Sequence, residues 1–279
     1  MLEMVLKAAL TLGALALLIG GLLAVASRVF AVRVDERVSK IEEILPHANC
    51  GGCGFAGCTA YANAVIRGDA TPNACTAGGP AVSQGIAKIL GVEVDTRERR
   101  VAHVYCSGGN LTAHRFNYTG VQTCYAASRT AGGPVECSFA CLGYGDCVHT
   151  CQFDAIYLKD GHAIVNRDKC TGCGKCVAGC PRKTIALIPM SKQISVNCSS
   201  RDRGAYVRGM CEAGCIGCKI CEKKCPNDAI HVTDNLARID YDKCTACGAC
   251  MDACPRGIIR NEENFFVVAT RDGNSASNS

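Results

Sequence analysis

Three stretches of the chain repeat the spacing C-x2-C-x2-C-x3-C-P without a defect. Bacterial ferredoxins use this spacing: three thiolates of one short loop bind a [4Fe–4S] cluster, and the fourth cysteine reaches the other cluster of a pair. Zinc sites combine two close cysteine pairs across a longer loop, so the pattern fits zinc poorly. The predicted ligands in these runs are Cys170, Cys173, Cys176 and Cys180; Cys215, Cys218, Cys221 and Cys225; and Cys244, Cys247, Cys250 and Cys254.

The fourth cysteine of each run decides how the clusters are shared. In a pair of runs, each fourth cysteine is expected to bind the cluster of the other run. The sequence therefore predicts that Cys254 completes the cluster of the run that starts at Cys215. By the same exchange, Cys225 is predicted to complete the cluster of the run that starts at Cys244.

A fourth run departs from the ferredoxin spacing. It reads C-x3-C-x5-C-x3-C, with Gln152 where the other runs have proline and with a longer, glycine-containing loop. An Asp-Ala-Ile sequence still follows, as it does after Cys225, which indicates a ferredoxin half-module. Its first three cysteines are predicted to share a cluster with Cys180, and its last to complete the cluster of the Cys170 run. The cysteines of this run are Cys137, Cys141, Cys147 and Cys151.

A cysteine group nearer the N-terminus has the different spacing C-x2-C-x4-C-x16-C. Four thiolates again suit one [4Fe–4S] cluster, and the glycines between them allow backbone amides to approach the sulfurs. Gly52, Gly54 and Gly57 also spell G-x-G-x-x-G, but no strand precedes them, so a dinucleotide-binding turn is rejected. The predicted ligands are Cys50, Cys53, Cys58 and Cys75.

Four cysteines remain outside these groups, namely Cys106, Cys124, Cys198 and Cys211. They are enough for a sixth cluster in addition to the five predicted above. The alternatives are buried free thiols, a spare ligand, or disulfides, which are disfavoured in a reducing cytoplasm. The sequence leaves these alternatives open.

The composition also indicates metal centres. The 279 residues include 24 cysteines and no tryptophan, so clusters are expected to help hold the fold together. The formal charge of +5 is mild and basic runs are short, which disfavours nucleic acid as a partner. The six histidines are scattered and no nucleophile–base arrangement stands out, so no catalytic residue is assigned. Lys219, Lys223 and Lys224 are either solvated surface or a docking site for an acidic electron donor.

The N-terminal segment contains twenty consecutive uncharged residues, Ala8 to Ser27. As a helix they would span about 30 Å, the thickness of the bilayer hydrocarbon core. Basic residues are more frequent after this segment than before it, so the positive-inside rule places the bulk of the chain in the cytoplasm. A cleaved signal peptide is the alternative, but the apolar run is long and its charge lies on the wrong side.

These features predict an α+β chain with an N-terminal transmembrane helix, a small helical 4Fe-4S domain and two tandem dicluster-ferredoxin-like domains built from βαβ repeats. The expected parts are a membrane anchor at 1–28, the 4Fe-4S domain at 32–92, a connecting region at 93–136, ferredoxin-like domains at 137–190 and 211–265 with a linker at 191–210 between them, and a disordered tail at 266–279.

A membrane anchor, a C-x2-C-x4-C-x16-C domain and ferredoxin modules, in that order, resemble the B subunit of the Rnf ion-translocating oxidoreductase complex. The stretch CGGCGFAGC, which begins at Cys50, is the most distinctive part of the resemblance. It implies that the cysteine groups above are cluster ligands. With four ferredoxin half-modules the chain resembles the long form of this family.

The resemblance also implies a role and partners. The chain would accept electrons from reduced ferredoxin and relay them to other membrane and flavin-bearing subunits, coupled to transport of Na⁺ or H⁺. It would thus be part of an oxidoreductase that is also a translocase. The alternatives are an anchored polyferredoxin component of a non-pumping oxidoreductase, and a non-redox zinc scaffold or iron–sulfur sensor.

Overall fold

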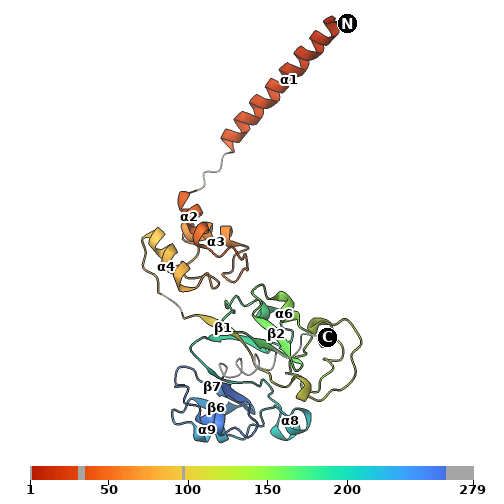
Figure 1. Ribbon diagram of the computed structural model, residues 1–279, viewed down its shortest axis with the longest axis vertical. Helices are drawn as coiled ribbons and strands as arrows, with labels where there is room; N and C mark the ends of the chain where they lie inside the picture. Colours follow the sequence, from red (N-terminus) through yellow and green to blue (C-terminus); the bar gives the residue numbers. More distant parts are fainter. Residues whose placement is uncertain (1, 31–34, 96–97, 262–279) are drawn as a thin grey trace, which may run out of the picture.

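The computed structural model describes residues 2–30, 35–95 and 98–261. The tail predicted at 266–279 lies outside the described residues. Helix α1, Leu2–Val29, extends away from the rest of the molecule (Figure 1). Its large apolar side chains are exposed, Leu17 at 81%. Among the described residues, α1 is the one helix long and apolar enough to cross a membrane, which is consistent with membrane anchoring.

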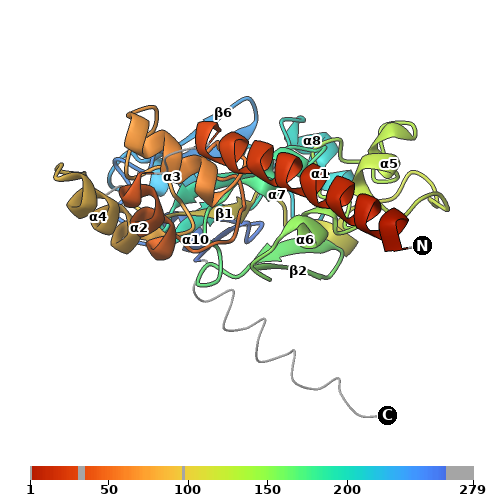
Figure 2. The same cartoon turned by 90° about the horizontal axis from the view of Figure 1, so that it is seen from above.

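A small helical unit follows, made of α2 (Glu36–Ile44), α3 (Cys58–Arg67) and α4 (Gly79–Leu90). The Asp35 side chain caps α2 by accepting a hydrogen bond from the backbone N–H of Arg37 at 2.9 Å. Left-handed glycines follow α3 and α4 and end them. Ile41 and Ile86 are fully buried between the helices. Figures 1 and 2 show this unit beside the strand-containing part.

The remainder has four two-stranded antiparallel sheets connected by short helices. In the first half, the outer strands β1 and β4 pair with each other, and the hairpin β2–β3 lies between them in the sequence. In the second half, the outer pair β5–β8 encloses the hairpin β6–β7 in the same order. The strands are β1 (Arg100–Val104), β2 (Ile156–Lys159), β3 (His162–Val165), β4 (Ile185–Pro189), β5 (Ile194–Val196), β6 (Ile230–Thr233), β7 (Leu236–Ile239) and β8 (Ile259–Asn261).

The outer strands extend both ferredoxin-like units beyond the predicted ranges. Strand β1 lies in the stretch expected to be a connecting region, and β5 lies in the expected linker. Each starts a module, and we call residues 100–189 the first module and 194–261 the second. Between each outer strand and the following hairpin lies a cysteine-bearing insertion. Its helical elements are η1 (Gly109–Leu111) and α5 (Cys124–Arg129) in the first module, and α8 (Gly204–Met210) in the second.

Four very short helices carry the third cysteine position of each run. They are α6 (Asp146–Thr150), α7 (Lys175–Gly179), α9 (Ile220–Lys224) and α10 (Ala249–Asp252). In each of them the second residue is a cysteine, and the residue before the helix has a positive φ. The backbone that leads into the helix is therefore similar in all four half-modules.

The main core is unusual because ten of its buried residues are cysteines, which lie among Val, Ile and Ala side chains from the paired strands. A separate core holds the helical unit, where Val38, Ile41 and Ile86 pack around Tyr61. Both cores place sulfur where most proteins place aliphatic carbon. Groups bound by these sulfurs would therefore contribute to the stability of the fold.

The helical unit offers a matched pair of variants. Ile41→Ala removes a fully buried side chain and should destabilise this unit by about 2–5 kcal/mol. Ile44→Ala, in the same helix but at a position 36% exposed, should have a much smaller effect. Hydrogen exchange of the α2–α4 amides in the full chain measures both. Equal protection in the two variants would contradict the proposed packing.

Candidate metal centres

All twenty-four cysteines lie in the described part of the chain, and each is a free thiol. The disulfide alternative for the four extra cysteines is therefore excluded. Within the described residues, no three His, Cys, Asp or Glu side chains converge tightly enough to hold a single metal ion. A tetrahedral zinc site would require such convergence, with sulfurs about 2.3 Å from the ion.

The cysteines predicted near the N-terminus do come together. Burial raises the pKa of the Cys75 thiol, and the nearby thiols of Cys53, Cys50 and Cys58 add to this rise. The loop is held closed because the backbone N–H of Cys58 donates to Oδ1 of Asn49 at 2.8 Å. We call these four cysteines the Cys50 group.

The second module brings together the first of its two predicted sets. Burial raises the pKa of Cys221 to about 11, with further contributions from Cys215, Cys254 and Cys218. These four, the Cys215 group, line a cavity with an empty volume of about 330 Å³. The fourth thiol of this group, Cys254, thus belongs to the other run of the module.

The other set of the second module mirrors this arrangement. Burial raises the pKa of Cys250 to about 11, and Cys225, Cys244 and Cys247 lie near enough to add to the rise. These four, the Cys244 group, line one pocket, whose empty space, open solvent included, is about 310 Å³. The backbone N–H of Ala229 donates to Sγ of Cys225 at 3.3 Å. Such amide–sulfur bonds stabilise thiolate ligands of a cluster.

In the first module, a cysteine of the irregular run likewise lies beside the regular run. Burial raises the pKa of Cys176 to about 12, with added contributions from Cys170, Cys173 and Cys151. We call these four the Cys170 group. The backbone N–H of Ala102, in β1, donates to Sγ of Cys170 at 3.3 Å. The outer strand, which the sequence did not predict, therefore takes part in this site.

The irregular run differs from the prediction by one exchange. Burial raises the pKa of Cys147 to about 12, and the nearby thiols of Cys141, Cys124 and Cys180 add most to this rise. Cys137, which was expected here, lies instead beside Cys106 and Cys211. We call Cys124, Cys141, Cys147 and Cys180 the Cys141 group.

The register of the short helices explains this exchange. Cys147 and Cys221 are each the second residue of their helix, α6 and α9. Counting back six residues aligns Cys141 with Cys215, and counting back three aligns Tyr144 with Cys218. The irregular run is therefore a regular one in which tyrosine replaces the second cysteine. The regular spacing of Cys141, Tyr144 and Cys147 is present in the sequence. The extra cysteine at position 137 makes it difficult to recognise.

Cys124 lies close to the backbone of Tyr144 and to the thiols of Cys141 and Cys147. Burial raises the pKa of the Cys124 thiol, while hydrogen bonds from the backbone of Asp146, Tyr144 and Gly145 oppose the rise. The Asp146 carboxylate fixes the start of α5 by accepting the backbone N–H groups of Cys124 at 2.8 Å and Tyr125 at 2.9 Å. The insertion of the first module thus supplies the missing thiol.

The helical unit and the first module approach each other at Gly52. A Cβ placed on Gly52 would lie 3.0 Å from Cα and 3.1 Å from Cβ of Cys173. Only glycine permits this separation without movement. The Cys50 group and the Cys170 group are therefore neighbours.

Comparison with known proteins identifies the domains that contain most of these cysteines. Residues 45–77 match a family of Fe–S cluster domains, and residues 139–185 and 214–259 match the 4Fe-4S dicluster domain. The chain is 42% identical to the B subunit of an ion-translocating oxidoreductase complex of Methanosarcina acetivorans, covering 89% of this chain and 95% of the relative. This chain belongs to the family of B subunits of ion-translocating oxidoreductase complexes. The resemblance seen in the sequence is confirmed.

Two further relatives carry more specific names. The B subunit of the Na⁺-translocating ferredoxin:NAD⁺ oxidoreductase complex of Acetobacterium woodii is 41% identical over 91% of this chain and 77% of its own. The B subunit of the proton-translocating ferredoxin:NAD⁺ oxidoreductase complex of Clostridium ljungdahlii is also 41% identical, over 88% of each chain. The matched domains support [4Fe–4S] clusters as the cofactors, and the names support a multi-subunit complex.

The close approach at Gly52 gives a test of electron passage through this chain. Gly52→Val should push the helical unit away from Cys173 and slow electron exchange between the two parts several-fold. Iron content should stay the same, because Gly52 contributes no sulfur. Rapid-mixing absorbance measures the exchange. Gly209→Ala is the control, since its added methyl meets open space. An unchanged rate in Gly52→Val would contradict this contact.

Proposed function

We propose that this chain is the electron-entry subunit of a membrane-bound ferredoxin:NAD⁺ oxidoreductase that translocates ions. It would receive electrons from reduced ferredoxin and deliver them to membrane and flavin-bearing partner subunits. The observation that carries the proposal is the repeated enclosure of four thiols around one open space. When bound there, [4Fe–4S] clusters supply one-electron transfer.

The residues of this chain have three tasks in such a role. Cysteines hold each centre, backbone amides such as that of Ala229 bond to sulfur, and apolar side chains exclude water. These contacts tune the potential of each centre. No substrate chemistry beyond electron transfer is assigned to this chain.

The membrane end of the proposal rests on α1. Its apolar surface would be covered by lipid, and the basic residues Arg28, Arg37 and Lys40 follow the apolar stretch whereas Lys7 alone lies on the other side. This bias favours a cytoplasmic location for the cysteine-bearing part. A single N-terminal span in the cytoplasmic membrane is therefore proposed.

The surface of the second module suits the arrival of a soluble donor. Cys218 and Cys247 are exposed, unlike the other cysteines. Lys219, Lys223 and Lys224 are exposed close to Cys218 in the chain, and a positive surface would steer an acidic ferredoxin to it. We place the docking surface for ferredoxin here.

Iron analysis tests the cofactors. The anaerobically purified chain should contain about four irons and four sulfides for each of at least five centres, and its reduced form should show paramagnetic signals at low temperature. A folded chain that carries zinc and no iron would refute the proposal.

Charge reversal tests the docking surface. Lys223→Glu with Lys224→Glu should slow reduction by ferredoxin about tenfold at low salt and reduce the dependence on ionic strength. Stopped-flow kinetics measures both effects. Lys40→Glu with Lys88→Glu makes the same change in net charge on the exposed surface of α2 and α4. Equal rates for the two variants would move the docking site elsewhere.

Coupling separates a pumping complex from a non-pumping oxidoreductase. Membrane vesicles should accumulate Na⁺ or H⁺ when supplied with reduced ferredoxin and NAD⁺, and vesicles lacking this chain should not. The relatives named for Na⁺ and for protons are equally similar to this chain, so the assay includes both ions. Normal pumping in the absence of the chain would favour the non-pumping alternative.

A further inference from the structure

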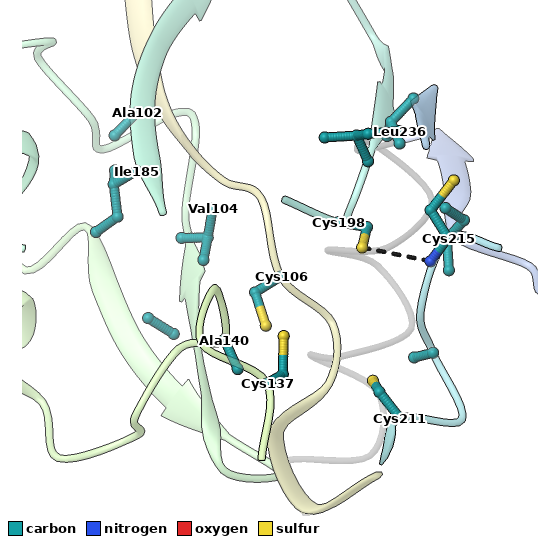
Figure 3. Packing of buried hydrophobic residues seen from close by; sticks show 14 of the residues in the cluster. Ala102, Val104, Cys106, Cys137, Ala140, Ile185, Cys198, Cys211, Cys215 and Leu236 are labelled. Carbon is teal, nitrogen blue, oxygen red and sulfur yellow. Dashed lines mark hydrogen bonds between the residues drawn. The ribbon is translucent and has the colours of Figure 1, made fainter. Parts of the chain in front are cut away.

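Four cysteines outside the five groups that hold the predicted centres face one another between the two modules. Cys106, Cys137, Cys198 and Cys211 line a single cavity with an empty volume of about 300 Å³, and none of the four is more than 8% exposed. Figure 3 shows their sulfurs arranged around this space. The Cys215 and Cys244 groups line cavities of about 330 and 310 Å³. By the number of thiols that line one space, this set resembles those two.

Each sulfur position in this set is fixed from a different element. Cys106 follows β1 and Cys198 follows β5 by the same two residues, so they occupy equivalent positions in the two modules. The preceding residues repeat one contact: Tyr105 N–H donates to the Thr184 carbonyl, and Asn197 N–H donates to that of Ile258, both at 2.7 Å. Cys137 and Cys211 come from the two insertions.

Hydrogen-bond donors point at these sulfurs as they do at the sulfurs of the regular runs. Sγ of Cys106 accepts from the backbone N–H of Cys141 at 3.3 Å and of Gly108 at 3.4 Å. Sγ of Cys198 accepts from the N–H of Cys215 at 3.3 Å. Backbone donors to sulfur favour the ligand thiolate over an inert thiol. A cysteine that serves only as a small apolar residue needs neither the donors nor the open space.

Glycine allows two of these sulfurs to approach the same backbone. A Cβ on Gly108 would lie 3.3 Å from Sγ of Cys211 and 3.6 Å from Sγ of Cys106. The hydroxyl of Thr112 also donates to Sγ of Cys211 at 3.5 Å. The loop after β1 therefore fits closely against two of the four thiols.

We propose that Cys106, Cys137, Cys198 and Cys211 bind a sixth [4Fe–4S] cluster, and that Cys124, rather than Cys137, is a ligand of the cluster bound by the Cys141 group. This inference rests on the proposed cluster-binding function of the chain. Cys137 is available for this role because the alignment of Cys147 in α6 makes Cys141 the first cysteine of the ferredoxin run. Cys137 then lies before the run. The sequence suggested a sixth set with Cys124 in it, but Cys124 lies beside Cys141 and Cys147.

The position of this set, the Cys106 group, connects the two modules. On one side the N–H of Cys141 bonds to Cys106, and on the other the N–H of Cys215 bonds to Cys198. Cys176 lies near Cys147, and Gly52 contacts Cys173, so the remaining neighbours are also adjacent. The thiol sets then form a series of neighbours in the order Cys50 group, Cys170 group, Cys141 group, Cys106 group, Cys215 group and Cys244 group, and the last two each contain a cysteine from the other's run.

Stepwise removal of thiols tests the grouping by iron content alone. The unsubstituted chain should hold about 24 irons, four for each of six centres. The double variant Cys106→Ala with Cys198→Ala should hold about 20, because both residues belong to one four-iron centre. Adding Cys137→Ala should remove no more iron, whereas adding Cys124→Ala should remove more. Inductively coupled plasma analysis and native mass spectrometry provide the counts.

Each result has a distinct meaning. If Cys137→Ala removes further iron from the double variant and Cys124→Ala does not, the grouping is wrong. If the double variant keeps the iron content of the unsubstituted chain, the sixth centre does not exist, while the proposed function survives. A chain without iron would refute both. The native mass of the unsubstituted chain needs no variant, and a mass corresponding to about 20 irons would by itself overturn the sixth centre.

Discussion

The constraint on which this structure depends is that sulfur must be held around an open space inside a chain with few large apolar residues. Ten buried cysteines occupy the main core, and the chain has no tryptophan. Thiols facing a space are a poor substitute for packed hydrocarbon, because the missing contacts cost stability. Metal–sulfur bonds would replace those contacts, so binding and folding are one process in such a chain.

The helices of the two modules show how little regular structure this requires. Helices α6, α7, α9 and α10 have five residues or fewer, too short to be stable by themselves. Each is preceded by a residue with positive φ and carries a cysteine at its second position. The turn sets the direction of the sulfur, and the antiparallel strand pairs hold the turns in place. Cysteine spacing therefore matters more here than helix propensity.

Much of the site could be predicted from the sequence because ligand spacing within a loop is a local property. The runs at Cys170, Cys215 and Cys244 and the set at Cys50 come together as the spacing indicated. The exchange of fourth cysteines could also be predicted, since a paired arrangement of half-modules repeats. The prediction from local spacing differs from the structure only at the irregular run. There the extra cysteine, Cys137, precedes a regularly spaced run in which Tyr144 stands at the second cysteine position.

The outer strands were missed for a different reason. β1 and β5 have five and three residues, and their partners β4 and β8 lie 80 or more and 60 or more residues away. Strand pairing at such separation depends on tertiary packing rather than on a local signal. The helix α1, in contrast, was predictable because twenty uncharged, mostly apolar residues in succession are a property of the sequence itself.

The two insertions follow from joining one module to another. A module with two thiol sets needs only its strands and its two cysteine runs. None of these elements places the thiol sets of one module close to those of the next. In this chain the junction is made directly after the outer strands, where Ser107 N–H donates to the Asn197 carbonyl at 3.1 Å. The insertions lie at this junction and carry Cys124, Cys137 and Cys211. They therefore shorten the separation that duplication of a module alone would leave between the thiol sets of the two modules.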